Sequence, residues 1–258
     1  LFPMKIALFQ TNLIWENPEA NRTFIEENFI NERESFDLFV LPEMFTTGFT
    51  MNPEYVAETM QGETISWMKS LALKKDCAVC GSLVISENNS FYNRFVFVHP
   101  NGKIDFYNKR HLFSLAGEHQ KYSKGTEKVI IDYKGWKICP QVCYDLRFPA
   151  FSRNHENYDL LLYVANWPKP RTNAWDILLK ARAVENMCFV VGVNRIGFDE
   201  NNHGYIGHSQ IIDELGNQTL DAEEKQGVFI IELDRNKMLE TRNKLNFLND
   251  KDEFEIIF

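Results

Sequence analysis

The stretch "ICPQVCYDLRFP", residues 138–149, places two cysteines, an acid and an arginine at the end of an apolar run. Its first five residues predict a strand, in which neighbouring side chains point to opposite faces. Cys139 lies within that strand, so we expect it in a core. Cys143 follows the strand at a turn, where a thiol faces a pocket and nearby backbone N–H groups. Pro140 has no N–H to donate, which predicts an irregular strand or a sheet edge.

Apolar runs of the same kind, bounded by turn residues, recur along the chain. They span residues 5–10, 36–42, 77–85, 93–100, 103–109, 136–142, 159–166, 189–195, 209–215 and 227–233. Several are apolar at consecutive positions, which is typical of strands buried on both faces. Asn101-Gly102, between two of these runs, predicts the turn of a hairpin.

Longer amphipathic stretches between the runs predict helices. They cover roughly residues 17–35, 62–75, 146–155 and 172–188. We place the N-cap of the last helix at Thr172. Its buried side is expected to consist of Trp175, Leu178, Leu179 and Arg182. Strands covered on both faces, combined with helices, indicate a layered α/β architecture.

The bulk properties exclude several classes of protein. The 258 residues contain no Gly-, Pro- or Ser-rich linker and no repeat, which favours one domain over residues 4–258, with residues 1–3 a short addition before a native start at Met4. A net charge of −8 without a basic run argues against a nucleic-acid partner. No apolar stretch approaches the ~20 residues of a membrane span. Five cysteines, an odd count, and no visible secretion signal predict a reduced, cytoplasmic protein.

The cysteine spacing raises the question of a metal site. Cys77-x-x-Cys80 has the spacing of zinc ligands, but no second pair lies at finger distance. Residues three apart in a strand point to different faces, so we expect both to be apolar filler and expect no metal. The tail from Asn246 onward fits either a packed arm or a subunit contact.

Side chains that could take part in catalysis or ligand binding follow four of the predicted strands. Glu43, Lys109 and Cys143 each stand at a strand end, and Asn166-Trp167 ends a fourth strand. Ligands of open α/β sheets gather at the carboxyl ends of strands, so these side chains are expected to meet there.

A thiol nucleophile needs a base, and a buried lysine needs an acid. Glu43 follows the apolar run 36–42, so burial should raise its pKa and let it carry a proton at neutral pH. Considered alone, Glu43 could be part of an ordinary ion pair and Lys109 could be a surface lysine. Considered together, each supplies the opposite charge that the other needs in a buried position. A Cys–His hydrolase with His111 or His119 as the base is the alternative.

Three segments resemble the motifs of the nitrilase superfamily of carbon–nitrogen hydrolases, in the same order. They are "LPEMFTTGF" with Glu43, "YNKRHLF" with Lys109 and "CYDLRFP" with Cys143. "GEHQKYSKG" with Glu118, "ANWP" and "KARAVENMCFVVGVNR" are similar too, so the resemblance runs from Met4 to about Asp252. The residues of these motifs resemble those of the ω-amidase branch in particular. Ala150 departs from the pattern, since many members carry an acid there.

The resemblance implies a four-layer αββα sandwich and a Glu43–Lys109–Cys143 triad without a cofactor. Glu118 would be a second catalytic glutamate that holds Lys109 or the substrate amide, and the Tyr144 N–H would help to bind the oxyanion. The implied reaction is hydrolysis of the side-chain amide of a small 2-oxo acid, 2-oxoglutaramate or 2-oxosuccinamate, through a cysteine thioester. Family members assemble as dimers or larger, here through residues 180–191.

Substrate selection requires a cation for the remote carboxylate. Arg147 follows the nucleophile by four residues, and its planar fork suits a carboxylate, although it could instead tie down a helix. Phe113, Asn166 and Trp167, with Phe45 and Tyr144, are the expected pocket walls; bare aromatic residues are also common in cores.

Three other functions stay open at this point. An N-carbamoyl amino acid amidohydrolase, or another small aliphatic amidase or nitrilase, would share the triad. A non-catalytic interaction protein could keep the fold, and the Cys–His hydrolase is the third. Two glutamates and one lysine sum to −1, so we also predict that Cys143 shares a proton with the glutamates as one coupled system.

Overall fold

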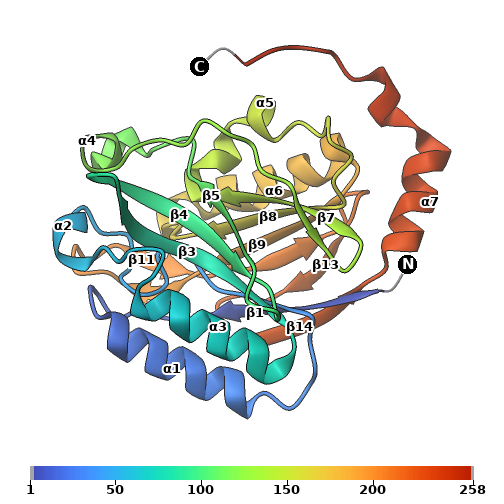
Figure 1. Ribbon diagram of the computed structural model, residues 1–258. Coiled ribbons are helices and arrows are strands. Elements are labelled where there is room, and N and C mark those ends of the chain that lie inside the picture. Colours follow the sequence, from blue (N-terminus) through green and yellow to red (C-terminus); the bar gives the residue numbers. More distant parts are fainter. Residues whose placement is uncertain (1–2, 257–258) are drawn as a thin grey trace.

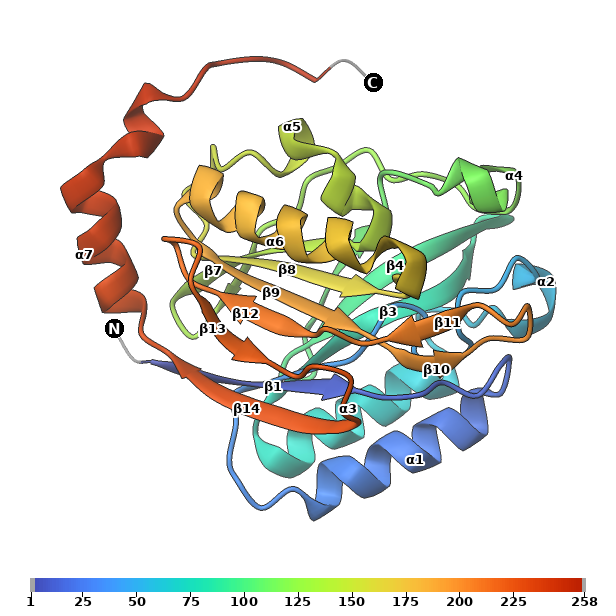
Figure 2. The same cartoon turned by 180° about the vertical axis from the view of Figure 1, so that it is seen from behind.

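The computed structural model describes residues 3–256 and shows two six-stranded sheets packed face to face (Figure 1). Helices cover the outer face of each sheet, as the view from behind shows most clearly (Figure 2). The layer order is therefore helix, sheet, sheet, helix, which confirms the predicted four-layer αββα sandwich.

The first sheet has the strand order β14-β1-β2-β3-β4-β5. Its strands are β1 Met4–Gln10, β2 Leu38–Val40, β3 Ala78–Glu87, β4 Ser90–Val98, β5 Ile104–Asn108 and β14 Gly227–Leu233. The β1, β2 and β3 strands run parallel, and β4 and β5 continue as antiparallel hairpins. The β4–β5 hairpin turns at Asn101-Gly102, as predicted. β14 returns from the far end of the chain to pair with β1.

The second sheet has the order β13-β12-β9-β8-β7-β6. Its strands are β6 Ile131–Tyr133, β7 Trp136–Val142, β8 Leu160–Ala165, β9 Phe189–Asn194, β12 Gln210–Ile212 and β13 Gln218–Asp221. β7, β8 and β9 run parallel. β6 pairs with β7 only as far as Ile138, so Pro140 lies where β7 has no β6 partner, as its missing N–H predicts. β10 Ile196–Phe198 and β11 Gly204–Ile206 form a separate hairpin.

Helices α1 and α3 cover the first sheet, and α6 covers the second (Figures 1 and 2). The helices are α1 Pro18–Asn31, α2 Pro53–Val56, α3 Glu63–Lys75, α4 Glu118–Lys121, α5 Pro149–Ser152, α6 Thr172–Asn186 and α7 Arg235–Leu245. α1 begins where the Asn17 side chain accepts from the Ala20 N–H and Pro18 needs no partner for its nitrogen. Among residues 3–256, no helix combines the length and the apolar character that crossing a membrane requires.

Alternation along the strands divides the core into layers. In β1, Ile6 and Leu8 belong to the cluster between the sheets, whereas Ala7 and Phe9 face α1 and α3. Cys80 lies in the central cluster and Cys77 in the outer one, so the two thiols point apart as predicted. Cys139 is buried under α6, also as predicted. Across the described residues, no group of three or more His, Cys, Asp or Glu side chains could hold a metal ion.

Three local predictions were wrong. Residues 146–155 do not form one helix; a 3₁₀ segment, η2 Cys143–Arg147, is followed by the four-residue α5. Thr172 is the first residue of α6 rather than its N-cap, which is Arg171. The β6, β10, β11 and β13 strands fell outside the predicted runs because their sequences, IDY, IGF, GYI and QTLD, interrupt the apolar residues with polar residues or glycine.

Candidate active site

Glu43 lies in the loop after β2 and is fully buried. The loop packs so closely on β3 that a Cβ on Gly81 would come within 2.7 Å of the Phe45 ring. Met44 then adopts a left-handed conformation, with φ 43°, and donates its N–H to the Ser82 hydroxyl at 2.9 Å. This turn directs the Glu43 carboxylate into the space between the two sheets.

Lys109 follows β5 and is also fully withdrawn from solvent. Its ammonium donates to Glu43 Oε1 at 2.9 Å and to both oxygens of Glu118 at 3.0 Å. Burial lowers the pKa of Lys109, but the charges of Glu118 and Glu43 raise it more, so the pKa lies above its ordinary value. The ammonium therefore stays charged in a dry environment.

Glu118 opens α4 and completes the buried cluster. Besides Lys109, its carboxylate accepts the Phe113 N–H at 2.5 Å. Burial raises the pKa of Glu118 above its usual range, the Lys109 charge opposes this rise and the Glu43 charge adds to it. Two carboxylates and one ammonium leave the cluster with an excess negative charge, which favours uptake of a proton.

Cys143 comes from the opposite sheet, at the sharp end of β7. Its φ of 46° is in the left-handed region, which is unusual for a side chain other than glycine. The Asp145 carboxylate holds this turn by accepting the Val142 N–H at 2.9 Å and the Tyr107 hydroxyl at 2.9 Å. It also accepts the N–H and the ring Nδ1–H of His111 at 2.9 and 2.8 Å. The buried Asp145 thus joins the cysteine turn to the segment that carries Lys109.

The Cys143 sulfur lies 4.0 Å from the Asn166 carbonyl oxygen, and its residue is only partly buried. Burial raises the pKa of the thiol well above its ordinary value, and the nearby Glu43 carboxylate raises it further, by charge and as a hydrogen-bond acceptor. Lys109 opposes this rise. The thiol is therefore protonated at rest, with a carboxylate placed to receive its proton.

Thiolate absorbance should reveal this resting state. We expect wild type and Cys143→Ser to show the same ultraviolet absorbance from about pH 6 to about pH 8, because the Cys143 thiol stays protonated there. A difference spectrum with one full thiolate at about pH 6 would contradict a protonated resting thiol.

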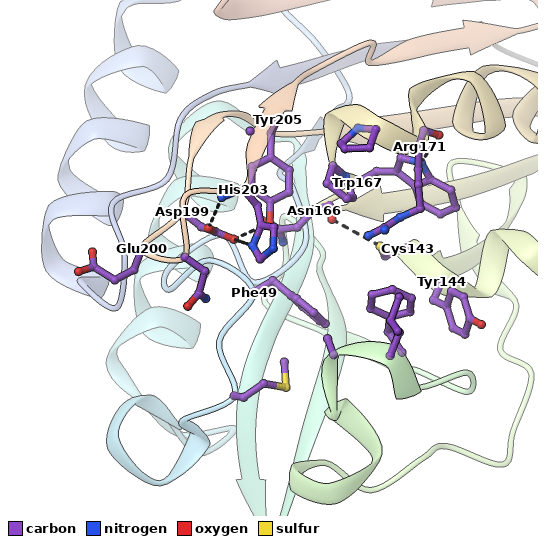
Figure 3. Close-up of a pocket in the computed structure, with 18 of the residues that line it drawn as sticks. Phe49, Cys143, Tyr144, Asn166, Trp167, Arg171, Asp199, Glu200, His203 and Tyr205 are labelled. Carbon is purple, nitrogen blue, oxygen red and sulfur yellow. Dashed lines mark hydrogen bonds and ion pairs between the residues drawn. The ribbon is translucent and has the colours of Figure 1, made fainter.

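A cavity of about 740 Å³ opens over Cys143 (Figure 3). Phe113, Tyr144, Arg147, Asn166 and Trp167 line it, as predicted. Phe45 does not line it: the prediction of Phe45 as a pocket wall was wrong, because its ring is buried in the outer core against β3. Glu43, Lys109 and Glu118 lie behind the wall, which is formed in part by Asn166 and Phe49. Asn166 donates its backbone N–H to Glu43 Oε2 at 2.8 Å, and Lys109 Nζ lies 5.2 Å from the Phe49 ring centre.

The two ends of the cavity differ in charge. Arg147 stacks over the Trp167 ring at 5.0 Å, and Arg171 over the Phe113 ring at 5.1 Å. Within residues 3–256 neither guanidinium forms an ion pair with a carboxylate. At the other end, Asp199 accepts from the Tyr205 hydroxyl at 2.9 Å and is paired with His203 at 3.2 Å (Figure 3).

The structure also shows residues that the sequence did not single out. They are Asn93, Asp145, Arg171 and Asn194. Asn194 fixes the loop after β8 by accepting the Trp167 N–H at 2.7 Å and donating to the Trp167 carbonyl at 3.0 Å. Each is an ordinary polar residue in its local sequence, and only the tertiary contacts distinguish it.

The candidate histidine bases lie elsewhere. His111 is bound to Asp145 and stacks on Phe148 with ring centres 3.9 Å apart. His119 is exposed on α4, and neither histidine lines the cavity. The arrangement therefore favours Glu43 over His111 or His119 as the partner of Cys143.

Comparison with known proteins agrees with this geometry. The carbon-nitrogen hydrolase family model matches residues 5–243. The omega-amidase YafV of Yersinia enterocolitica is 43% identical over 98% of this chain and 99% of its own. The 2-oxoglutaramate amidase of Bacillus subtilis is 33% identical over 95% of this chain and 96% of its own.

A solved structure is similar over the whole fold. XC1258 of Xanthomonas campestris, described as a CN-hydrolase superfamily protein with an arsenic adduct in its active site, superposes with a TM-score of 0.97. It is 38% identical, and the match covers 99% of this chain and 100% of the other. From the family match, the near full-length relatives and the shared fold, this chain belongs to the carbon-nitrogen hydrolase family.

Proposed function

We propose that this protein is an ω-amidase, which hydrolyses the side-chain amide of a small 2-oxo acid, such as 2-oxoglutaramate or 2-oxosuccinamate, to the dicarboxylate and ammonia. The observation that carries the proposal is the buried Glu43–Lys109–Glu118 cluster directly behind a cavity lined by Cys143. The names of the Yersinia and Bacillus relatives support the substrate class.

The geometry supports a two-stage reaction at Cys143. Glu43 takes the thiol proton while the sulfur attacks the amide carbon, and the Lys109 ammonium and the Tyr144 N–H stabilise the resulting oxyanion. Collapse of the tetrahedral species breaks the C–N bond, and Glu43 returns the proton to the nitrogen, which leaves as ammonia. Glu43 then removes a proton from water, water attacks the thioester, and the acid departs with the thiol restored.

The two unpaired guanidiniums supply the recognition of the remote carboxylate. Arg147 and Arg171 line the cavity on the same side as Cys143, and their stacking on Trp167 and Phe113 keeps the forks extended. Since arginine binds carboxylates through two parallel N–H groups, an acid substrate can replace water on both cations. Arg171 extends the prediction, which named Arg147 alone.

Arg147→Lys should raise KM for 2-oxoglutaramate about 10- to 100-fold, because a point charge replaces a bidentate contact with the carboxylate. For a plain amide of similar length, without a carboxylate, the KM should change by less than about threefold. Steady-state assays on both amides measure the two effects. Equal losses would assign Arg147 a structural role instead.

Ammonia release tests the proposed function directly. The assay uses 2-oxoglutaramate, 2-oxosuccinamate, glutamine, asparagine and an N-carbamoyl amino acid side by side, with Cys143→Ala as the blank. The 2-oxo acid amides should be turned over fastest. Faster release from the carbamoyl compound, together with CO₂, would replace the proposal with the carbamoyl hydrolase.

We further propose a homodimer or larger assembly in a reducing, cytoplasmic compartment. The five free thiols fit that compartment. The predicted contact, residues 180–191, needs revision because most of its second half is buried within the chain. Of the predicted contact, Val184 is exposed, and we add Ile177 on the same helix, α6, as the second exposed apolar residue of the proposed contact.

A further inference from the structure

The side chain of Asn93, in β4, bridges the two buried glutamates. Its Nδ2 donates to Glu43 Oε1 at 2.7 Å and to Glu118 Oε1 at 3.2 Å. Both oxygens also accept from Lys109 Nζ, at 2.9 and 3.0 Å. The two Oε1 atoms therefore share one charged and one neutral donor group, and Asn93 is itself only 1% exposed.

The direction of the Asn93 amide is fixed by a neighbour. Ser82 accepts the Met44 N–H, so its hydroxyl is left to donate to Asn93 Oδ1 at 2.8 Å. A flipped amide would place an oxygen against two carboxylates and a nitrogen against a donor. A chain of hydrogen bonds thus starts at the Met44 N–H in the turn after Glu43. It passes through the Ser82 hydroxyl and the Asn93 amide and returns to the Glu43 carboxylate.

We infer that Asn93, oriented by Ser82, is a positioning residue that keeps Glu43 ionised as the base, in place of a second cation. One ammonium cannot balance two carboxylates, and the neutral Nδ2 group stabilises the remaining negative charge by hydrogen bonding. Together with Lys109 it fills Oε1 of Glu43 with donors, whereas Oε2 of Glu43 accepts from Asn166. The inference rests on the proposed role of Glu43.

The groups that set this proton balance come from several elements. The titratable side chains around Glu43 are Lys109 after β5, Glu118 in α4, Tyr122 after α4 and Cys143 in η2. Lys109 favours the ionised carboxylate, whereas Glu118 opposes it. Without the Asn93 donor, the carboxylate pair holds its proton to higher pH, so the base is absent at pH values where wild type is active.

The test is the pH profile of kcat/KM for Asn93→Ala and Ser82→Ala. The acid limb of Asn93→Ala should move upward by about one to two pH units, the effect of one hydrogen bond to a charged group. That of Ser82→Ala should move in the same direction by less. Asn154→Ala, which removes a buried asparagine bound to Tyr158 and Asn186, is the matched control, and its acid limb should stay in place.

The outcomes separate this inference from the proposed function. The inference is overturned if both variants only melt at a lower temperature while the acid limbs of their pH profiles stay in place. If Asn93→Ala does not fold, the pH profile of Ser82→Ala alone decides the question. If wild type turns over no amide, the proposed function fails. The pH dependence of Cys143 alkylation by iodoacetamide then replaces turnover, since the other four cysteines are buried. The same upward shift is expected there, and its absence overturns the inference.

Discussion

Glu43→Gln should lower kcat/KM by about 10²- to 10⁴-fold, the usual value of a positioned general base. Glutamine has the size of glutamate, so the loop after β2 can keep its shape while the group that accepts the Cys143 proton is lost. Steady-state ammonia release measures the effect, and circular dichroism checks that the variant is folded.

The control for this substitution is His119→Ala, since His119 is exposed and lies outside the cavity. Its turnover should stay within about twofold of wild type. A Cys–His hydrolase would give the reverse pattern, with loss of activity in a histidine variant and near-normal activity in Glu43→Gln. That reversal would remove Glu43 from the mechanism.

Lys109→Met should be damaging in two ways. Loss of an oxyanion donor costs about 10²- to 10³-fold in rate. The variant also leaves Glu43 and Glu118 buried without their counter-charge, which should lower the free energy of unfolding by about 3–5 kcal/mol at neutral pH. Urea unfolding at several pH values measures the second effect.

The stability loss in Lys109→Met should depend on pH in a defined direction. Burial already raises the pKa of Glu118 and the Lys109 charge opposes that rise, so without the ammonium the folded-state pKa of Glu118 lies further above its unfolded value. The stability that Lys109→Met loses relative to wild type is then smallest near about pH 4 and grows as the pH rises through this folded-state pKa. Lys121→Met removes an exposed pair with Glu54, which water and salt screen, so it should leave the unfolding midpoint almost unchanged. A pH-independent loss in Lys109→Met would contradict this account.

Much of the cluster could be anticipated because the opposite charges of its members offset the free-energy cost of burying each one. A glutamate and a lysine that each follow an apolar strand require a shared partner, and the structure brings Glu43 and Lys109 within 2.9 Å. Most of the longer strands were predictable from consecutive apolar residues, since a sheet buried on both faces has few polar positions. The layers followed from the same pattern.

Other features depend on contacts that local sequence does not encode. Asn93 looks like any polar residue of a hairpin, and its role arises only from the register that sets β4 beside β3. The predicted helix at 146–155 failed because Phe148 precedes a proline and adopts a non-helical conformation, with φ −116° and ψ 88°. The Asp145 side chain, by binding Val142 and His111, holds the preceding turn in its place.

The excess negative charge of the buried cluster has a consequence for the end of the catalytic cycle. Hydrolysis converts an uncharged amide into a group that ionises next to Glu43 and Glu118, in surroundings that screen charges poorly. The repulsion leaves the overall equilibrium of the reaction unchanged, but it makes the site bind the acid product more weakly than the amide substrate. Inhibition by the accumulating acid product is thereby reduced.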